Sequence, residues 1–487
     1  SDQGNFIPVY CEVLADLETP VSAWYRVCSG AKYSFLLESV EGGRIGRYSF
    51  LGCEPLWVLS ARGEQCEQVF RDGESIVHQG DPFEVLRTCL IPYEPVHLPE
   101  LPPGLGGLFG YWGYELIRWI EPRVPVYDAA PDQVLPDGFW MQVDSLLVFD
   151  QLKRKIWVVA YADLREQSPR AAYDQAVARV NELVERMRSA NLPTQPLSFE
   201  WAPSEPGVPT ESTFTRAQYC EAVERARQYI RAGDIFQVVL AQRLSTPFAG
   251  DPFHLYRTLR VINPSPYMAY YNFGNFQLIG SSPEVMVRLD REGGKAIASL
   301  RPIAGTRKRG QTEEEDRWLE KDLLADPKEV AEHVMLVDLG RNDLGRVCQP
   351  GTVRVDELLA IERYSHVMHI VSNITGELAE HQSAWDLLKA TFPAGTVSGA
   401  PKIRAMEIIH ELETFWRGPY SGAYGYYSFD GQLNTAITIR TMVVEAGRVS
   451  VQAGAGLVAD SVPETEYEET LNKARGLLET IARVAAQ

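Results

Sequence analysis

Carboxylates at helical spacing are the first residues of this sequence that could do chemistry. Glu329 and Glu332 lie three residues apart, so a helix would place both on one face. Later in the sequence, Glu469 and Lys473 lie four residues apart, and Gly476 follows on the same side. Carboxylates from two such helices could together hold Mg²⁺, which prefers oxygen ligands and shares its shell with an anionic substrate. Each pair alone also has a simpler interpretation: Glu329 and Glu332 could lie on a solvated helix face, and Glu469 and Lys473 could form an exposed ion pair.

Two glycine-bearing segments are candidates for binding an anion. We expect Gly454, Ala455 and Gly456 to form a turn between a strand and the last helix, and Gly305 with Thr306 to form another turn. Backbone N–H groups freed by such turns can bind a carboxylate. For Gly454–Gly456, the alternative is that the glycines only allow the chain to turn and bind no ligand. The second segment lies in a basic cluster, which favours anion binding there: Arg301, Arg307, Lys308 and Arg309.

Other motifs that would define a known chemistry are incomplete. Segment 395–402 (GTVSGAPK) departs from the G-x-x-x-x-G-K-[ST] pattern, which argues against a phosphate-binding loop for nucleotides. Ser398 lies outside a G-x-S-x-G elbow, and His369 lies outside the H-E-x-x-H pattern of zinc proteases. From its neighbours alone, His369 is expected to be an ordinary core or surface histidine.

The elements that must position these residues change character along the chain. Before residue 160, short apolar runs broken by Gly, Pro and Asp predict strands, for example at 33–37, 48–51, 57–60, 145–149 and 156–160. A helix follows, with Ser168 as N-cap and Pro169 in its first turn. Its apolar stripe is expected to consist of Tyr173, Val177, Val180, Val184 and Met187. Proline-rich residues 191–212 are predicted to link two domains, 1–190 and 213–487.

The second half mixes helices and strands. Thr215 and Gln218 form a capping-box pattern, and Gly233 is expected to end the helix that follows. Residues 235–244 predict a strand with Gln237 on one face. Two further helices are expected to begin near residues 326 and 463. Because strands and helices show no regular βαβ alternation, the sequence predicts an α+β protein.

Length and composition are those of a globular protein. The 487 residues are 45% hydrophobic and 23% charged, with a formal net charge of −18. This charge argues against nucleic acid or an anionic membrane as a main partner, because both would be repelled. The seven cysteines contain no C-x-x-C pair, no apolar run approaches the ~18 residues of a membrane helix, and the first ten residues lack signal-peptide features. We therefore expect a cytoplasmic protein.

Seven motifs in one order, within residues 215–480, resemble those of the chorismate-utilising enzyme family. They are 280–284 (GSSPE), 302–306 (PIAGT), 332–343 (EHVMLVDLGRND), 395–402 (GTVSGAPK), 422–426 (GAYGY), 452–456 (QAGAG) and 469–475 (ETLNKAR). The first half resembles the family's first domain at 36–39 (LLES) and 107–111 (GLFGY). The resemblance implies layered β-sheets, a β-sandwich core flanked by helices, to which both halves of the chain contribute.

The resemblance also implies roles for the residues of one active site. Glu332 and Glu469 would hold Mg²⁺, which neutralises the ring carboxylate of chorismate. Glu284 would donate a proton to the departing C4 hydroxyl. His369 and Thr396 would assist the later loss of a ring proton and of pyruvate. The enolpyruvyl carboxylate and the anionic pocket around it would be contacted by Tyr420, Arg440, Gly454, Ala455, Gly456, Gly305, Thr306 and Lys473.

Two positions distinguish the branches of the family. Its water-adding members resemble one another in carrying a lysine where this chain has Gln237, and glutamine can position a nucleophile but cannot act as a base. Members that make 4-amino-4-deoxychorismate use a lysine nucleophile where this chain has Ala304. The remaining reaction is attack of ammonia at C2 and loss of pyruvate, which gives anthranilate for tryptophan biosynthesis. The alternatives are 4-amino-4-deoxychorismate synthesis and a non-catalytic sensor of aromatic metabolites on the same fold.

Partners and regulation are implied in the same way. None of the seven cysteines lies in a glycine-rich nucleophile elbow, so ammonia would come from a separate glutamine amidotransferase subunit, component II. Segments 36–39 and 263–268 (NPSPYM) resemble the family's tryptophan feedback site, although each alone also fits a strand end or a proline-rich turn. Glu38 would offer its charge to the amino group of the inhibitor. The implied inhibitor-binding residues are Glu38, Ser39, Pro266, Tyr267 and Met268.

Overall fold

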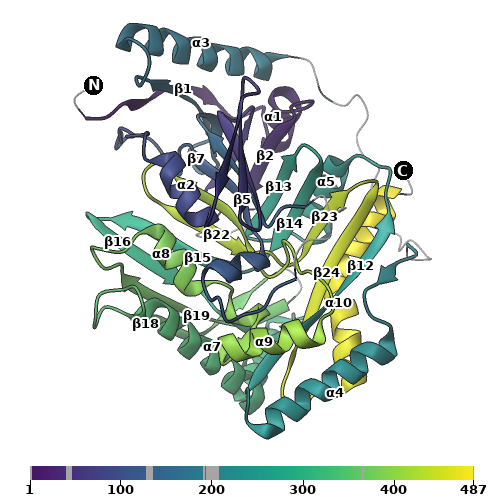
Figure 1. Ribbon diagram of the computed structural model, residues 1–487. Helices are drawn as coiled ribbons and strands as arrows, with labels where there is room; N and C mark the ends of the chain where they lie inside the picture. Colours follow the sequence, from purple (N-terminus) through teal and green to yellow (C-terminus); the bar gives the residue numbers. More distant parts are fainter. Residues whose placement is uncertain are drawn as a thin grey trace.

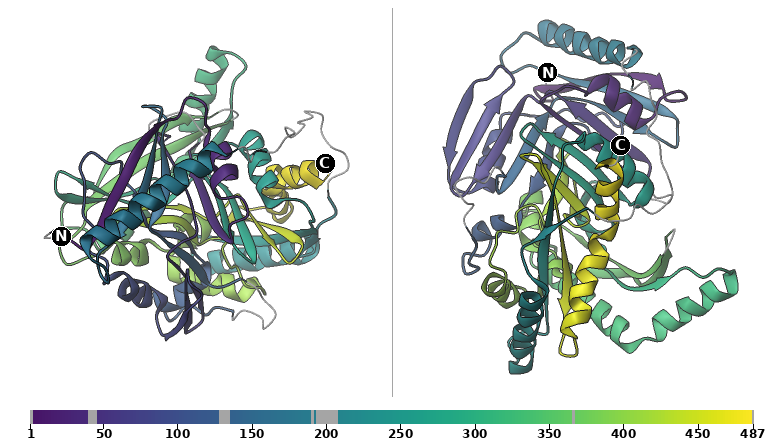
Figure 2. Two further views of the ribbon diagram at one scale, coloured as in Figure 1. Left: turned by 90° about the horizontal axis from the view of Figure 1, so that it is seen from above. Right: turned by 90° about the vertical axis from the view of Figure 1, so that its right-hand side faces the viewer.

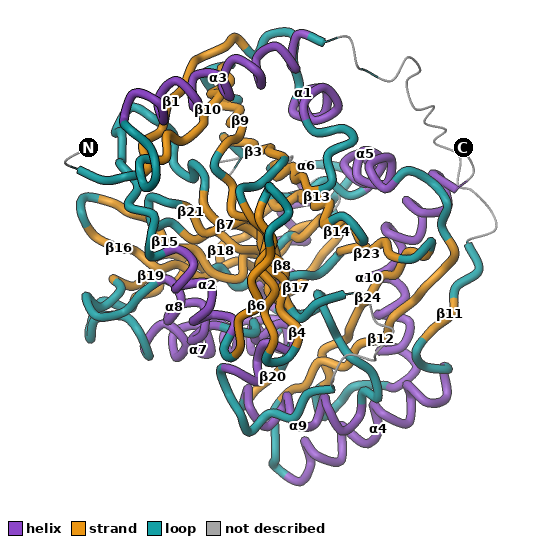
Figure 3. The backbone as a smooth tube through the Cα atoms, turned by 45° about the horizontal axis from the view of Figure 1, so that its top comes forward, coloured by secondary structure: helices purple, strands orange, loops and turns teal. Residues whose placement is uncertain are grey.

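The computed structural model describes residues 3–39, 46–127, 135–189, 192, 208–364 and 367–485 (Figure 1). These residues form two large antiparallel sheets with helices outside them (Figure 3). The predicted α+β class and its layered sheets are confirmed. Most of the predicted linker at 191–212 lies outside the described residues. Within the described part of the chain, no helix is both long and apolar enough to cross a lipid bilayer.

The first sheet takes its strands from both ends of the chain. Its order is β1-β10-β9-β3-β2-β13-β14-β23-β24-β12-β11, with β20 beside β12. The strands are β1 (Phe6–Leu14), β2 (Tyr33–Glu38), β3 (Tyr48–Cys53), β9 (Ser145–Asp150), β10 (Lys155–Asp163), β11 (Glu211–Ser212), β12 (Gln237–Pro247), β13 (Tyr267–Phe273), β14 (Phe276–Ser282), β20 (Gly399–Ala400), β23 (Thr441–Glu445) and β24 (Arg448–Leu457).

The second sheet is built in the same way. Its order is β17-β19-β16-β15-β22-β21-β7-β8-β4-β5-β6, with β18 beside β19. The strands are β4 (Trp57–Arg62), β5 (Gln65–Phe70), β6 (Ser75–Gln79), β7 (Gly107–Trp112), β8 (Gly138–Val143), β15 (Val285–Glu292), β16 (Lys295–Leu300), β17 (Ile303–Lys308), β18 (Arg354–Arg363), β19 (Val367–Glu377), β21 (Ala423–Ser428) and β22 (Leu433–Ile437).

Strands from the two halves of the chain pair directly near the middle of each sheet. In the first sheet β2 pairs with β13, and Leu37 lies opposite Ala269. In the second sheet β7 pairs with β21, and Gly110 lies opposite Gly425. The purple N-terminal strands therefore continue into strands from later in the chain in both views of Figure 2. Both halves contribute to each sheet, as the family resemblance implies.

Helices cover the outer face of each sheet, and aromatic side chains fill the space between the sheets. The first sheet is covered by α1 (Pro20–Val27), α3 (Pro169–Arg188), α5 (Pro252–Ile262) and α10 (Pro463–Ala485). The second is covered by α2 (Pro82–Leu90), the 3₁₀ helix η1 (Tyr114–Trp119), α7 (Pro327–Gly345) and α8 (Ala384–Thr391). The remaining helices are α4 (Arg216–Ala232), α6 (Glu313–Ala325), the 3₁₀ helix η2 (Gly395–Val397) and α9 (Lys402–Leu412).

The predicted helix boundaries are confirmed by their hydrogen bonds. Ser168 accepts a bond from a backbone N–H in the first turn of α3, and Thr215 and Gln218 form the predicted capping box of α4. Gly233 ends α4 with a φ of 83°, a left-handed conformation that favours glycine. Asp326 caps α7 as predicted, and the helix continues to Gly345. The last helix, α10, begins at residue 463 as predicted.

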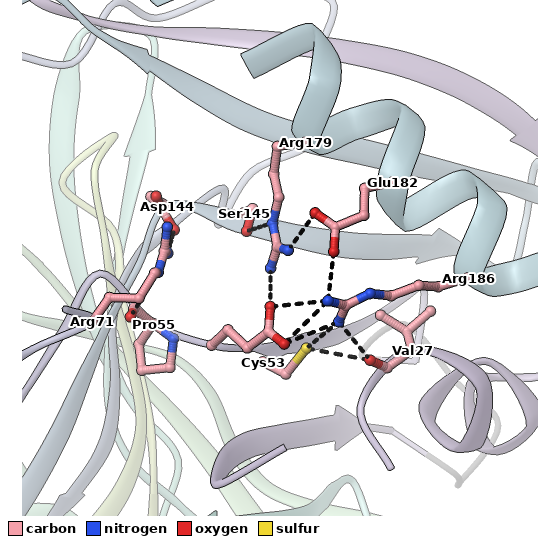
Figure 4. A network of polar contacts seen from close by, with 10 residues as sticks. Val27, Cys53, Pro55, Arg71, Asp144, Ser145, Arg179, Glu182 and Arg186 are labelled. Carbon is pink, nitrogen blue, oxygen red and sulfur yellow. Dashed lines mark hydrogen bonds and ion pairs between the residues drawn. The ribbon is translucent and has the colours of Figure 1, made fainter. Parts of the chain in front are cut away.

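The predicted apolar stripe of α3 is confirmed at Val180 and Met187, which are buried, and is wrong at Tyr173. Tyr173 is 49% exposed. The buried side chains are those of Ala172, Ala176, Val180, Leu183 and Met187. Polar contacts fix this orientation: Arg179 and Arg186 turn toward β3, where both pair with Glu54 at 2.9 and 3.1 Å (Figure 4). The spacing of apolar residues within a helix cannot predict a charged partner that lies far away in the sequence, such as Glu54.

Two of the places where the chain crosses between the sheets touch each other. β14 of the first sheet leads into β15 of the second, with Glu284 in the crossing. β22 of the second sheet leads into β23 of the first, with Arg440 in the crossing. Ser281 donates a backbone hydrogen bond to Arg440 (3.0 Å), and Ile437 donates one to Glu284 (3.0 Å). The fold thus holds both crossings together at the junction of the sheets.

Candidate active site

A cavity of about 540 Å³ lies beside the two crossings. Its walls come from both crossings and from β12, β17, β24, η2, α7 and α10. Twelve residues predicted for the active site line it together: Gln237, Glu284, Gly305, Thr306, Glu332, Thr396, Tyr420, Arg440, Gly454, Gly456, Glu469 and Lys473. The fold brings them to one place from segments spread over the second half of the chain.

Glu284 is an acid buried in the wall of this cavity. It is 7% exposed, and burial raises the pKa of its carboxyl to about 8. Thr396 and the positive charge of Lys473 oppose this rise to a smaller extent. The carboxyl is therefore mostly protonated at neutral pH and has a proton to donate.

One side of the cavity is positively charged. Arg440 donates from Nη1 to the backbone oxygen of Lys473 (2.6 Å), and Lys473 donates from Nζ to the backbone oxygen of Gly454 (2.9 Å). Tyr420 lines the same side, and burial raises the pKa of its phenol to about 12, so the hydroxyl stays protonated. A guanidinium, an ammonium and a phenol that converge in this way can bind a carboxylate by charge-assisted hydrogen bonds.

The opposite charge comes from four glutamates, which α7 and α10 supply in pairs. They are Glu329 and Glu332 on α7, and Glu466 and Glu469 on α10. Burial and then the neighbouring Glu332 charge raise the pKa of Glu329, and burial is also the main cause of the raised pKa of Glu466. Carboxylates gathered in one partly buried place repel one another, and a cation bound between them would relieve this repulsion.

This donor set fits magnesium. Carboxylate oxygens are the ligands that Mg²⁺ prefers, and it is usually held by one or two of them together with waters and an anionic substrate. Among the described residues, no group of three or more His, Cys, Asp or Glu side chains forms a complete metal site. Glu332 accepts a hydrogen bond from Gln237 Nε2 (3.2 Å), and Glu469 pairs with Lys473 Nζ (2.7 Å).

Glu466 and Gln452 also line the cavity, and neither is among the site residues predicted from the sequence. Glu466 precedes Glu469 by three residues, as Glu329 precedes Glu332, so the repeated spacing was a usable signal. Gln452 has a buried Nε2 without a partner in the structure. Nothing local in the sequence marks this glutamine, because its place depends on the pairing of β24 with β12.

The predicted turn at Gly454–Gly456 is wrong. These residues lie within β24, where Gly454, Ala455 and Gly456 face Ala241, Leu240 and Val239 of β12. The glycines are needed for space: a Cβ at 454 would lie 2.7 Å from Tyr420 Oη, and one at 456 would lie 2.8 Å from Gln237 Nε2. Ala455 has its side chain on the other face of the sheet, in the core under α4 and α9, and does not line the cavity.

The predicted turn at Gly305–Thr306 is also wrong. The two residues lie in β17, at an irregularity in its pairing with β19, where Gly305 has a φ of 70°. The three arginines of the basic cluster around them are already paired with carboxylates and so do not form a free anion site. Arg301 pairs with Glu362, Arg307 with Asp322, Asp326 and Glu329, and Arg309 with Asp316.

His369 lies on β19, directly behind the part of the wall that Gly305 and Thr306 form. Its Nδ1 is 2.9 Å from the backbone oxygen of Gly305 and 3.1 Å from Thr306 Oγ1. Because a carbonyl can only accept, Nδ1 carries the proton and Nε2 is left as the basic nitrogen. Burial lowers the pKa of the imidazole, which keeps it neutral at neutral pH. His369 therefore contacts the wall but is not itself among the lining residues.

A second cavity of about 240 Å³ lies between the two sheets, where the residues predicted to bind an inhibitor meet. Glu38, Ser39, Pro266, Tyr267 and Met268 border it from the first sheet. Tyr424, Tyr426 and Asn434 line it from the second. Two of its polar atoms, Ser39 Oγ and Asn434 Oδ1, are buried without a partner in the structure. Such atoms are costly to leave unbonded, so the cavity is suited to a ligand with polar groups.

The role predicted for the Glu38 side chain is contradicted by its contacts. Its carboxylate pairs with Arg260 (2.9 Å) and accepts a hydrogen bond from Tyr256, both on α5 at the outer face of the sheet. Met268 lies directly opposite Glu38 in the sheet, and its side chain packs into the same outer core. Since side chains alternate along a strand, those that point toward the cavity are on the neighbouring positions, including Ser39 and Tyr267.

Known proteins share this sequence and fold. A family profile described as chorismate binding enzyme matches residues 33–479. Anthranilate synthase component 1 of Synechocystis sp. is 64% identical over 99% of this chain and 97% of that protein, and its counterpart from Thermus thermophilus is 48% identical over 97% of each. The crystal structure of anthranilate synthase component I from Streptococcus pneumoniae TIGR4 is 38% identical, covers 96% of this chain and 99% of its own, and has a TM-score of 0.76.

A more distant structure shares the fold. The menaquinone-specific isochorismate synthase of Escherichia coli is 19% identical over 98% of this chain and 95% of its own, with a TM-score of 0.72. The family profile matches nearly the whole chain, and the relatives compared above are similar over nearly their full length. These matches identify the family of the chain that forms the cavity. The chain belongs to the chorismate binding enzyme family.

Proposed function

We propose that this chain is the synthase subunit of an anthranilate synthase, which converts chorismate and ammonia into anthranilate, pyruvate and water. Three relatives with the name anthranilate synthase component 1 align over nearly the whole chain, and the most similar of these three is 64% identical. The observation that carries the proposal is the cavity, which holds a buried protonated Glu284 together with the cationic side chain of Arg440.

The first stage uses Glu284 as a general acid. Ammonia adds to C2 of the ring, both ring double bonds shift toward C4, and the C4 hydroxyl leaves. Hydroxide is a poor leaving group, so the proton of Glu284 joins it and water departs. Arg440 and Tyr420 bind the enolpyruvyl carboxylate and fix the ring against Glu284.

Gln237 supports ammonia rather than water as the nucleophile. Its Nε2 donates to Glu332, while its Oε1 is buried without a partner in the structure. The free oxygen can accept a hydrogen bond from N–H and direct the lone pair of ammonia, whereas an amide cannot take a proton from water. Ala304 also lines the cavity, and its methyl group cannot form a covalent intermediate.

The second stage removes the ring proton at C2 and expels the enolpyruvyl group as pyruvate, which makes the ring aromatic. The basic Nε2 of His369 and the hydroxyl of Thr396 are the groups that we assign to this step. His369 is held in one orientation by Gly305 (2.9 Å), and its lowered pKa keeps Nε2 unprotonated. Movement of the strand β17 by a small distance would expose the ring to the cavity.

Glu332 and Glu469 are the side chains that would hold magnesium. When it is bound, the metal neutralises the ring carboxylate of chorismate and favours one orientation of the ring. Glu329 and Glu466, on the same helix faces, add negative charge around the site.

We assign the source of ammonia to a separate glutamine amidotransferase subunit, component II, and the protein to the cytoplasm. All seven cysteines are free thiols, as in a reducing compartment. Burial raises the pKa of most of them, for example to about 12 for Cys66 and about 11 for Cys89, so these are poor nucleophiles. Cys53, whose pKa is lowered, is buried under α3.

The test is anthranilate fluorescence with the purified chain, chorismate and Mg²⁺. Ammonium salts should give anthranilate and pyruvate in equal amounts, and glutamine should give none until component II is added. Anthranilate formed from glutamine by the pure chain would contradict the assignment of component II. Consumption of chorismate into a product that keeps the enolpyruvyl group would show a different member of the family.

We further propose that tryptophan inhibits the reaction from the second cavity. Ser39 and Asn434 supply unpaired polar atoms, and Tyr267 with Tyr426 supplies aromatic surface for an indole. Because the carboxylate of Glu38 already pairs with Arg260, the amino group of the ligand would bond to Ser39, Asn434 or backbone oxygens instead.

A further inference from the structure

One side chain that lines the second cavity spans the two sheets. Tyr424 lies on β21 of the second sheet, lines the 240 Å³ cavity and is 2% exposed. Its hydroxyl reaches the first sheet, where it donates to the backbone oxygen of Tyr267 (2.7 Å). The hydroxyl oxygen of Tyr424 also accepts a hydrogen bond from the backbone N–H of Ser282 (3.1 Å). Burial raises the pKa of the phenol, so it keeps the single proton that it donates.

Ser282 leads directly to the general acid. It is the last residue of β14, two positions before Glu284, in the crossing between the sheets. Its side-chain oxygen lies 3.3 Å from the backbone oxygen of Glu284 and 3.4 Å from the backbone nitrogen of the same residue. A displacement of the Ser282 backbone therefore shifts the segment that aims the Glu284 carboxyl into the active-site cavity.

A second set of bonds joins the same two segments. Ser265 donates to the backbone oxygen of Ser282 (2.7 Å) and accepts from the backbone N–H of Tyr267 (3.3 Å). Ser281 donates to the backbone oxygen of Asn263 (2.5 Å). Segment 263–268, which borders the second cavity, is thus bonded on both sides to the end of β14.

The packing leaves little freedom at this junction. A Cβ at Gly280 would lie 2.7 Å from Tyr424 Oη, so only glycine there lets the phenol approach β14. Two of the sequence motifs, 280–284 and 422–426, therefore meet at one hydrogen-bonded contact.

We propose that Tyr424 is a positioning residue for Glu284 and the link through which a ligand in the second cavity acts on the reaction. A ligand that displaces Tyr424 or Tyr267 must stretch or break the bond to Ser282, and the crossing that carries Glu284 moves with it. This inference rests on the proposed binding of tryptophan in that cavity. In this proposal the junction of the sheets has two arrangements. Tryptophan and chorismate favour different ones, and the hydroxyl of Tyr424 connects the two binding sites.

The experiment measures the coupling between the ligands in the full-length chain. Tryptophan affinity is determined by calorimetry with and without chorismate and Mg²⁺, in the absence of ammonia so that the reaction does not proceed. Coupling of this kind is typically about 5–150-fold in affinity and is reciprocal. For the wild type we expect chorismate to weaken tryptophan binding by a factor in this range. For Tyr424→Phe, which removes both hydrogen bonds of the hydroxyl, the factor should fall to below about twofold.

Tyr426→Phe is the matched control. Tyr426 lies on the same strand and face and lines the same cavity, but its hydroxyl is not bonded to Ser282. It should keep the coupling factor of the wild type. Ser265→Ala removes the two bonds of the Ser265 hydroxyl and leaves Tyr424 in place. It should reduce the factor partly, and it provides the test if Tyr424→Phe fails to fold.

The positioning role has a readout that does not need tryptophan. Tyr424→Phe should shift the alkaline limb of the pH profile of kcat/KM for chorismate, because the environment of Glu284 changes. An unchanged coupling factor in Tyr424→Phe would overturn the link, and an unchanged pH profile would overturn the positioning role. If the wild type binds no tryptophan, the proposed regulation fails, whereas a shifted pH profile would still support the positioning of Glu284.

Discussion

Glu284 owes its proposed chemistry to its surroundings. A glutamic acid in water is ionised at neutral pH, but burial in the cavity wall raises the pKa of this one to about 8. The protonated form, which donates, predominates below that pH and is lost as the pH rises through it. The sequence identified Glu284 through its motif, whereas the shifted pKa depends on burial that only the fold creates.

We therefore predict an alkaline limb in the pH profile of the reaction. At constant concentration of free ammonia, kcat/KM for chorismate should fall above pH 8, because this quantity reports the free enzyme. Glu284→Gln cannot donate the proton and should lower kcat by about 10²–10⁴-fold. Steady-state kinetics across this range check both statements. A kcat/KM that still rises at higher pH would contradict the acid role.

Replacement of one glutamate of α10 should show whether Glu469 is a ligand of Mg²⁺ or only one of several negative charges on the helix. Glu469→Gln removes a negative charge from the cavity and should weaken Mg²⁺ binding by at least about tenfold, measured by calorimetry and by the Mg²⁺ dependence of turnover. Glu468→Gln is the control, since Glu468 is exposed on the same helix and pairs with Arg216 at 3.3 Å. Equal Mg²⁺ affinity of the two variants would show that Glu469 is not a ligand.

At the scale of elements, the sequence predicted what depends on local chemistry. The capping box at Thr215 and the glycine that ends α4 are local signals, and both are confirmed. The prediction for the segment around Gly454 is wrong because its strand is defined by pairing with β12, which lies far earlier in the sequence. The Arg301–Arg309 cluster was misjudged because its acidic partners, such as Asp322 and Glu362, lie on other elements.

Gly456 lies on the side of β24 that lines the active-site cavity. Because glycine has no side chain, room for substrate remains there: a Cβ would lie 2.8 Å from Gln237 Nε2 and 3.9 Å from Glu332 Oε1. Gly456→Ala should lower kcat/KM for chorismate at least about tenfold, while thermal stability changes little because alanine suits a strand better than glycine. Arg448→Ala, at the start of the same strand, is the control. Wild-type kinetics for Gly456→Ala would mean that this floor of the cavity does not contact substrate.

At the scale of the whole molecule, a ligand in the second cavity would bridge both sheets. Tryptophan should therefore stabilise the folded chain, by about 2.7 kcal/mol at a concentration 100 times its Kd. Ser39→Phe fills the cavity from β2 and should abolish this stabilisation together with the inhibition, while the uninhibited rate stays close to that of the wild type. Thermal unfolding with tryptophan, and with phenylalanine as a control ligand, measures the effect. Equal stabilisation of both proteins would place the tryptophan site elsewhere.

The pairing of early and late strands also determines when the chain can fold during its synthesis. Glu38 bonds to Arg260 across 222 positions of the sequence, and Glu115 bonds to Arg417 across 302. The first strands to leave the ribosome therefore wait, with unpaired edges, until the central strands of both sheets have been made. We expect slow, late folding of the nascent chain, and an N-terminal fragment that aggregates unless chaperones hold it, because β13 and β21, the partners of β2 and β7, lie in the second half of the chain.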